Sequence, residues 1–484
     1  MPTKIRHFQK NARSLRFFGT LNKLSTAAQT YLLLAAPAAF FFSFYPVIRL
    51  GSSTSMNFEL SLTLIWLALF CLASLPKFFQ NLHFYPPRTS LLLFFPAYAF
   101  LSVLWSANPL RAILTALLLA AVYFAIFSLL PFLSSQKSFH LKLLKSFLYS
   151  STIVAAFCWL QCLLDILQFP RSVSLLCPGC TYLSFGFPHP NGFAIEPQFM
   201  GNLLLAPTLV ALFYLLKSPQ TPFPHLKLIT FLLLATLFLT FSRGAIYAFA
   251  LGAIILFLGF LITVRKYRPP LYSLGLILSA FLFSLVAQGL FANFAPTNDT
   301  FFTGVTKSMH QLSLGRIDLR SYIQASSDHN TSKDIAKFSK SAPHSLPQSH
   351  FSGYVTESTN IRLKLSNLAL DVWDNQRSRM LFGAGLGSAG TVIYQAHPEL
   401  GSAKEIVQNQ YVSLLLELGI LGLIFLFLPL LIISRQFFMN TKNHHRFLIL
   451  SLVASFAVSL CFFAGLPNAL HIYLSVAFLL IITK

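Results

Sequence analysis

Long apolar runs recur along the chain and limit its fold more than any other feature. A helix needs about 20 such residues to cross a bilayer. Of the 484 residues, 55% are hydrophobic and only 10% are charged, whereas a soluble domain has roughly 25% charged residues. The pattern predicts an all-α polytopic integral membrane protein. About twelve transmembrane helices are expected, at residues 31–50, 59–79, 90–105, 110–132, 143–168, 197–216, 226–241, 245–264, 271–291, 409–434, 446–464 and 467–483.

The net charge of +22 is distributed unevenly between these spans. With a cytoplasmic N-terminus, the inner segments hold twenty Lys or Arg residues and the short outer segments hold four. This bias predicts that both termini are cytoplasmic. The basic character therefore reflects membrane orientation, and no nucleic-acid partner is expected. The four outer residues are Arg49, Arg111, Arg171 and Arg243.

The spans divide the chain into four regions. Residues 1–30 form a basic cytoplasmic tail, residues 31–291 hold nine helices, and residues 409–484 hold three more. Between them, residues 292–408 form a large polar loop. With a cytoplasmic N-terminus, nine helices before the loop place it on the extracytoplasmic (periplasmic) side. The basic residues of the loop itself do not argue against this, because long loops translocate largely regardless of their charge.

Two cysteines, Cys177 and Cys180, fall in the outer loop 169–196. An oxidising compartment would allow a local disulfide between them. A zinc site needs two further ligands, and the sequence has no second Cys pair of this kind. A structural disulfide and free thiols both stay open.

Two charged residues stand out near the outer face. Arg243 interrupts an apolar stretch that is too long for one span and suits two. It either snorkels at a helix end or acts in a site, since an arginine against hydrocarbon is costly. Glu196 ends a rigid Pro/Gly segment at the start of the predicted span 197–216. It either complements the helix dipole or serves as a general base beside the arginines.

The end of the large loop has helical periodicity. Residues 358–380 place Ile361, Leu365, Leu368 and Val372 on one face, with Arg362 elsewhere, which predicts an amphipathic helix. A flexible glycine turn is expected to follow at residues 382–387. Its alternating glycines do not indicate a nucleotide site, because no strand precedes them.

Several short motifs together resemble the bacterial O-antigen ligase and O-antigen polymerase superfamily. They cover most of residues 90–434 and follow a similar order. The motifs are Trp105-Ser106, Ser242-Arg243-Gly244, Arg362 about twenty residues before Gly383-Ala384-Gly385-Leu386-Gly387, and Asn409-Gln410-Tyr411 followed by Glu417-Leu418-Gly419-Ile420-Leu421-Gly422.

The resemblance implies a glycosyltransferase of the bacterial inner (cytoplasmic) membrane. It would move a glycan from undecaprenyl diphosphate to an acceptor on the outer face: lipid A–core for a ligase, another lipid-linked repeat for a polymerase. Arginine suits diphosphate oxygens, so Arg243 and Arg362 are the first phosphate-binding candidates, with Arg316, Arg171 and Arg111 behind them. No metal, ATP or other cofactor is implied, since the loop has no Asp-x-Asp motif and the chain no P-loop.

One position departs from the ligase pattern. Ligases of the superfamily usually have histidine directly before the asparagine of the Asn409 motif, and this chain has Gln408. Glutamine can orient a hydroxyl but cannot take its proton at neutral pH. Either Glu196 or His397 supplies the base, or the chain is a polymerase-like member that does not use that histidine. His189 is a further loop histidine with the same standing as His397.

Two other functions are compatible with the sequence. A transporter also often has twelve spans, but typically shows two repeats with a long cytoplasmic link between them, whereas here the long loop is outer and late. A non-catalytic membrane component of a polysaccharide assembly complex is favoured only if glutamine at position 408, in place of the histidine of the ligases, has removed the catalytic activity.

Overall fold

The computed structural model describes most of the chain outside the tail, the outer loop and the middle of the large loop. The described residues are 23–42, 47–52, 57–81, 91, 93–135, 137–167, 187–194, 196–217, 223–264, 268–295, 300–313, 351–400, 407–440, 443–463 and 474–475.

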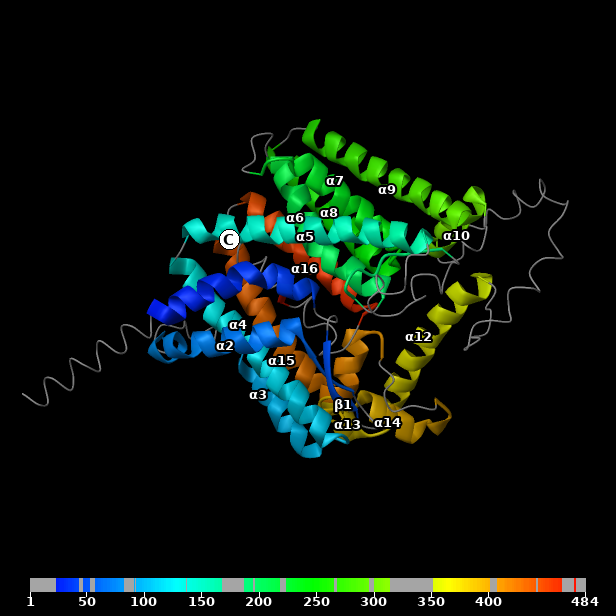
Figure 1. The fold of residues 1–484 in the computed structure, drawn as a ribbon. Coiled ribbons are helices and arrows are strands. Elements are labelled where there is room, and N and C mark those ends of the chain that lie inside the picture. The colour runs from blue at the N-terminus through cyan, green and yellow to red at the C-terminus, as the bar shows by residue number, and fades with distance from the viewer. Residues whose placement is uncertain are drawn as a thin grey trace, which may run out of the picture.

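Helices make up nearly all of this structure (Figure 1). A first helix spans Lys23–Phe41. The others up to residue 294 are α2 (Leu62–Asn81), α3 (Phe94–Leu101), the 3₁₀ helix η3 (Ser102–Trp105), α4 (Pro109–Ser135), α5 (Lys137–Ile166), α6 (Pro197–Lys217), α7 (Leu226–Leu239), α8 (Arg243–Val264) and α9 (Arg268–Phe294). After it come α10 (Phe301–Leu312), α12 (Phe351–Asp374), α13 (Arg377–Phe382), α14 (Ala389–Ala396), the 3₁₀ helix η5 (Pro398–Leu400), α15 (Gln410–Asn440) and α16 (Asn443–Leu460).

Seven helices of the described residues are long and apolar enough to cross a membrane, and four shorter ones are also apolar. Each overlaps one of the predicted spans, so the prediction of an all-α polytopic membrane protein is confirmed. The number twelve stays a prediction, because the last span, 467–483, lies almost entirely outside the described residues. The seven are Lys23–Phe41, Pro109–Leu129, Phe139–Ile166, Pro197–Lys217, Arg243–Thr263, Arg268–Phe294 and Gln410–Leu428.

The first span lies earlier in the chain than its hydropathy predicted. Its helix includes Lys23 and runs to Phe41, rather than covering residues 31–50. Side chains of its first turns hold it against α2, because Ser25 donates a hydrogen bond to the Ala73 carbonyl and the Gln29 amide donates to Ser74 Oγ. Part of the expected tail is therefore helical.

A β-hairpin, absent from the prediction, occupies the end of that span. Strand β1 (Val47–Ser52) pairs antiparallel with β2 (Asn57–Ser61). The register places Arg49 opposite Glu59. A run of hydrophobic residues counts toward a membrane span in a hydropathy window, whatever its backbone conformation, which is why the boundary was missed.

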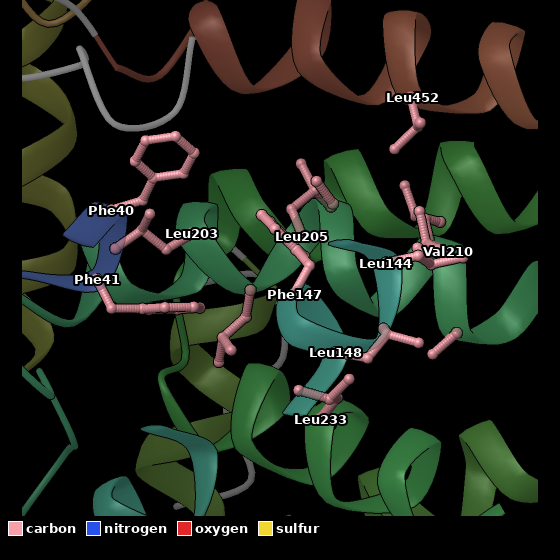
Figure 2. Close-up of a cluster of buried hydrophobic side chains, with 14 of the residues drawn as sticks. Phe40, Phe41, Leu144, Phe147, Leu148, Leu203, Leu205, Val210, Leu233 and Leu452 are labelled. Carbon is pink, nitrogen blue, oxygen red and sulfur yellow. The ribbon is translucent and has the colours of Figure 1, made fainter. Parts of the chain in front are cut away.

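Helix α6 forms the centre of the bundle. Most of its residues are buried, as expected of a helix that is apolar on all sides. In Figure 2, Leu205 and Val210 of α6 lie near Phe147 and Leu144 of α5, and Leu203 of α6 lies near Phe40. Leu233 of α7 and Leu452 of α16 belong to the same buried cluster. This core fixes the N-terminal end of α6, where Glu196 and Gln198 lie, relative to its neighbours.

Helices α8 and α16 pack closely through small residues. A Cβ atom at Gly252 would lie 2.1 Å from Ser455 Oγ, and Ser451 Oγ donates a hydrogen bond to the Gly252 carbonyl at 2.8 Å. Small residues that let helix backbones approach are a general feature of membrane bundles. This contact holds the middle of α8 against the middle of α16.

Replacing Gly252 with valine is expected to destabilise the protein by about 1–3 kcal/mol, because the added side chain overlaps Ser455. The measurement is the midpoint of thermal unfolding in detergent. Gly275→Val in α9 is the matched control, since no described atom lies within 4 Å of a Cβ at Gly275. Equal midpoints for both variants would contradict the packing described here.

Candidate active site

The glycine segment 382–387 is fixed rather than flexible. Gly383, Gly385 and Gly387 have φ values of +74°, +92° and +71°, a region that favours glycine over residues with a Cβ atom. A Cβ atom at Gly383 would lie 2.2 Å from the Glu417 carbonyl oxygen, and one at Gly385 would lie 2.3 Å from Ser106 Cα. The prediction of a flexible turn was therefore wrong, because the glycines permit close backbone packing.

Backbone groups of this segment form hydrogen bonds with α15 where that helix is interrupted. Gly419 has a φ of +65° and interrupts the helix. The Ala384 N–H donates to the Leu416 carbonyl and the Gly385 N–H to the Glu417 carbonyl, both at 2.8 Å. Backbone groups at membrane depth must be paired, and here a second segment replaces the lost helical partners.

The Tyr98 hydroxyl also contacts backbone carbonyl groups at the interruption of α15. It lies 3.1 Å from both the Leu418 and the Phe382 carbonyl oxygens, and so bridges the two segments. Tyr98 lies in α3 and has no distinctive sequence signal.

The Trp105-Ser106 motif completes this arrangement. Ser106 Oγ donates to the Leu386 carbonyl at 3.2 Å, and the Leu386 N–H donates to Ser102 Oγ at 3.1 Å. We call the contact region of residues 102–111, 381–391 and 416–419 the glycine junction. Three of the motifs behind the family resemblance thus meet in one place and act structurally there.

Arg111 lies at the glycine junction and interacts electrostatically with Glu417. The Glu417 carboxylate also accepts the Ala389 N–H at 3.2 Å and the Gly387 N–H. The charge of Arg111 is thus used beside a buried carboxylate, which makes it a weaker phosphate-binding candidate than a free guanidinium would be.

Arg362 reaches a different place, the start of α6. Its Nη2 donates to Gln198 Oε1 at 2.9 Å, across 164 residues of sequence. The Gln198 amide in turn donates to the Phe462 carbonyl at 2.5 Å. The loop helix α12 is thereby attached to the bundle through an amide that the sequence did not single out.

Arg243 lies next to this contact. It is the first residue of α8 and is half-buried. Its neighbour Gly244 packs on Phe462, where a Cβ atom would lie 2.8 Å from Phe462 Cβ. Arg243 and Arg362 therefore converge on one end of the bundle through Phe462 and Gln198. We call this region the arginine site.

Residues 228–427, which hold both arginines, match the family described as O-antigen ligase. The chain carries an O-antigen ligase domain. The resemblance to the O-antigen ligase and polymerase superfamily is thus confirmed for these residues. The matched family implies glycosyl transfer only in a broad sense, and together with the apolar helices it indicates a multi-pass membrane protein. No curated protein matches the chain.

Glu196 directly precedes α6 and lies before the ligase domain, which begins at residue 228. Its side chain is exposed, and its carbonyl accepts the N–H groups of Phe199 and Met200. It lies two residues before Gln198, the partner of Arg362. Both earlier interpretations, dipole complement and base, fit this position at the arginine site.

Gln408 lies just before α15, near the end of the ligase domain. Its Oε1 is buried and accepts no hydrogen bond from the residues that the structure describes. The neighbouring Asn409 caps α15, because its Oδ1 accepts the Tyr411 and Val412 N–H groups. Tyr411 Oη donates to the Ala457 carbonyl at 2.8 Å, so Gln408 lies near the end of α16 that carries Phe462.

His397 of the ligase domain follows α14 and pairs with Glu399, with 3.1 Å between Nδ1 and Oε1. The Glu399 backbone N–H, and then the His397 ring, lower the pKa of the Glu399 carboxyl. A carboxylate can orient an imidazole through a hydrogen bond, so this pair has the chemistry of a base. Described contacts do not join it to Gln198 or Arg362.

The remaining candidates are buried or not described. His189 is 3% exposed, with Nδ1 3.3 Å from the Phe187 carbonyl oxygen, which places it inside the protein rather than on the surface. The other candidates, Arg171, Arg316, Cys177 and Cys180, lie outside the described residues.

Proposed function

We propose that the ligase domain transfers a glycan from undecaprenyl diphosphate to an acceptor at the outer face of the bacterial cytoplasmic membrane. The observation that supports this most is the convergence of Arg362 and Arg243 at one end of the bundle. A diphosphate leaving group gains negative charge as its bond to the sugar breaks, and two guanidinium groups stabilise that charge.

In the proposed reaction, an acceptor hydroxyl attacks the anomeric carbon of the donor sugar. A new carbon–oxygen bond forms, and the bond to the diphosphate oxygen breaks with its electron pair. Undecaprenyl diphosphate leaves, held by Arg243 and Arg362. The proton of the hydroxyl passes to a base of the protein. The energy comes from the lipid diphosphate bond, and we propose no metal ion or cofactor.

Gln408 and Glu196 suit the acceptor side of this reaction. The buried Gln408 Oε1 is an acceptor that could receive the hydrogen bond of the attacking hydroxyl. We assign the base to Glu196, because it lies two residues from the partner of Arg362, and keep His397 as the alternative. Arg316, Arg171 and Arg111 stay secondary phosphate-binding candidates.

The proposal includes the orientation of the chain. Twelve helices with both termini in the cytoplasm would place residues 292–408 in the periplasm, together with the arginine site. Single cysteines at position 217 and in the loop would separate the two orientations. A membrane-impermeant thiol reagent applied to intact cells should label only the loop cysteine, and the reverse pattern would contradict the orientation.

Deleting the gene tests the function and separates its two forms. A polymerase deletion is expected to leave single repeats attached at the cell surface, whereas a ligase deletion is expected to leave free lipid-linked polymer. Gel electrophoresis of surface and lipid-linked glycans distinguishes them. Unchanged glycan in both fractions would contradict both forms and favour a transporter or a non-catalytic component.

A further inference from the structure

The end of α16 contacts three helices of the arginine site, although it lies beyond the residues that match the ligase family. Gly244 of α8 packs on Phe462. The Phe462 carbonyl accepts the Gln198 amide of α6, and the Ala457 carbonyl accepts the Tyr411 hydroxyl of α15. The matched residues end at 427, so these contacts attach the ligase domain to a segment outside it.

Backbone pairing makes the Phe462 carbonyl depend on Ser459. Carbonyl groups at the end of a helix lose their helical partners, and such groups at membrane depth must be paired elsewhere. The Phe462 N–H donates to the Ser459 carbonyl at 3.0 Å, so the position of Ser459 determines where Phe462 lies. The Phe462 carbonyl is then paired by the Gln198 amide.

A second polar contact joins α6 and α16 one turn deeper in the bundle. Ser459 Oγ donates to Asn202 Oδ1 at 3.0 Å, and the two residues are 1% and 3% exposed. Asn202 follows Gln198 by four residues, so both side chains lie on one face of α6. Side chains of α6 therefore hold α16 at two successive turns.

The direction of the Gln198 amide decides whether it can hold Arg362. Because Gln198 Nε2 donates to the Phe462 carbonyl, Oε1 is left for the Arg362 guanidinium, which donates to it at 2.9 Å. A reversed amide would place its N–H groups against a guanidinium, which has only donors. The Phe462 carbonyl therefore selects the amide direction that Arg362 needs.

Asn202 is a costly residue at its position. Its Nδ2 is buried and has no acceptor among the residues that the structure describes. An unpaired buried donor is destabilising, and leucine would fill a similar volume without that cost. The asparagine therefore favours a role in positioning Ser459 over a role in stability alone.

We propose that Asn202 and Ser459 are positioning residues of the arginine site. Their contact fixes the end of α16, the Phe462 carbonyl there sets the direction of the Gln198 amide, and that amide holds Arg362. Neither Asn202 nor Ser459 is assigned a contact with substrate. The inference rests on the proposed function, which gives Arg362 its role at the diphosphate, and it assigns a part in that function to two helices outside residues 228–427.

Ser459→Ala tests the proposal, because it removes one hydroxyl with little change in volume. It is expected to lower the rate of glycan transfer about fivefold. Ser455→Ala, one turn earlier on the same helix, is the matched control. Ser455 is 0% exposed, and its Oγ has no hydrogen-bond partner in the described part of the chain, so this variant should keep the wild-type rate.

Coupling to Gln198 separates positioning from a general loss of stability. In Gln198→Leu the path to Arg362 is already broken, so adding Ser459→Ala should lower transfer no further. A separate fivefold loss in that background would overturn the proposal. Equal losses in Ser459→Ala and Ser455→Ala, or wild-type transfer in Ser459→Ala, would also overturn it.

Hydrogen exchange of the purified full-length protein gives a readout that does not depend on transfer. The hydrogen bond to Gln198 attaches α12 to the bundle, so Ser459→Ala and Gln198→Leu should both speed exchange in peptides from residues 351–374. Ser455→Ala should not. Unchanged exchange of α12 in Ser459→Ala would contradict the positioning path. Failure of the proposed function has a different signature, because exchange would then respond as expected while the wild-type protein transfers no glycan.

Discussion

Replacing Arg362 with alanine is expected to lower glycan transfer by at least about 100-fold and to leave the amount of folded protein near normal. The guanidinium donates a hydrogen bond to Gln198, and we expect its loss to remove positive charge from the site more than it removes packing. Arg362→Lys keeps the charge but loses the fork that fits two phosphate oxygens, and should recover only part of the activity.

Arg377→Ala is the matched control for this prediction. Arg377 begins α13 in the same loop and is exposed, so its replacement should leave transfer unchanged. Transfer is measured as the rate of glycan joined to acceptor per mole of folded protein. Wild-type activity in Arg362→Ala would remove Arg362 from the site.

Gln198 should act through Arg362 rather than independently. Gln198→Leu is expected to lower transfer about tenfold, because the guanidinium loses its partner. In the double variant with Arg362→Ala, the effect should be no larger than that of Arg362→Ala alone. Additive effects would mean that the contact does not position Arg362.

The second large effect is expected at the glycine junction, where Gly385→Ala should destabilise the protein by at least about 3 kcal/mol. The φ of +92° disfavours any residue with a Cβ atom, and that atom would lie 2.3 Å from Ser106 Cα. Neither segment can move without losing the hydrogen bonds that join Ser106 to Leu386 and Gly385 to Glu417.

The readout for Gly385→Ala is the yield of monodisperse protein after detergent extraction, with Gly275→Ala in α9 as the control at an open position. We expect loss of folded protein in the first variant and wild-type yield in the second. A folded but inactive Gly385→Ala protein would instead place the glycine junction in the active site and contradict its structural role.

Local features of the site were predictable from the sequence. The break between α7 and α8 falls where Arg243 interrupts the apolar run. The predicted amphipathic helix exists as α12, with Leu365 and Val372 buried and Ile361 on its exposed side. These features follow from hydropathy and periodicity, which act over one or two helical turns.

Contacts between distant segments were not predictable. The hydrogen bond of Arg362 joins residues 164 positions apart, and nothing in the local sequence of Gln198 indicates it. The glycines of residues 383–387 indicate unusual backbone, but only the structure shows that they pair with the break at Gly419. The likeness to the ligase superfamily therefore rested partly on motifs that hold the bundle together.

The most direct test of glycan transfer uses the purified protein in lipid nanodiscs, with lipid-linked glycan as donor and either lipid A–core or a second lipid-linked repeat as acceptor. Released undecaprenyl diphosphate and joined glycan are measured in the same sample. Wild-type protein should produce both in equal amounts, and Arg243→Ala and Arg362→Ala should produce neither. Wild-type protein that forms no joined glycan with either acceptor, or two arginine variants as active as wild type, would contradict the proposed glycan transfer at the arginine site.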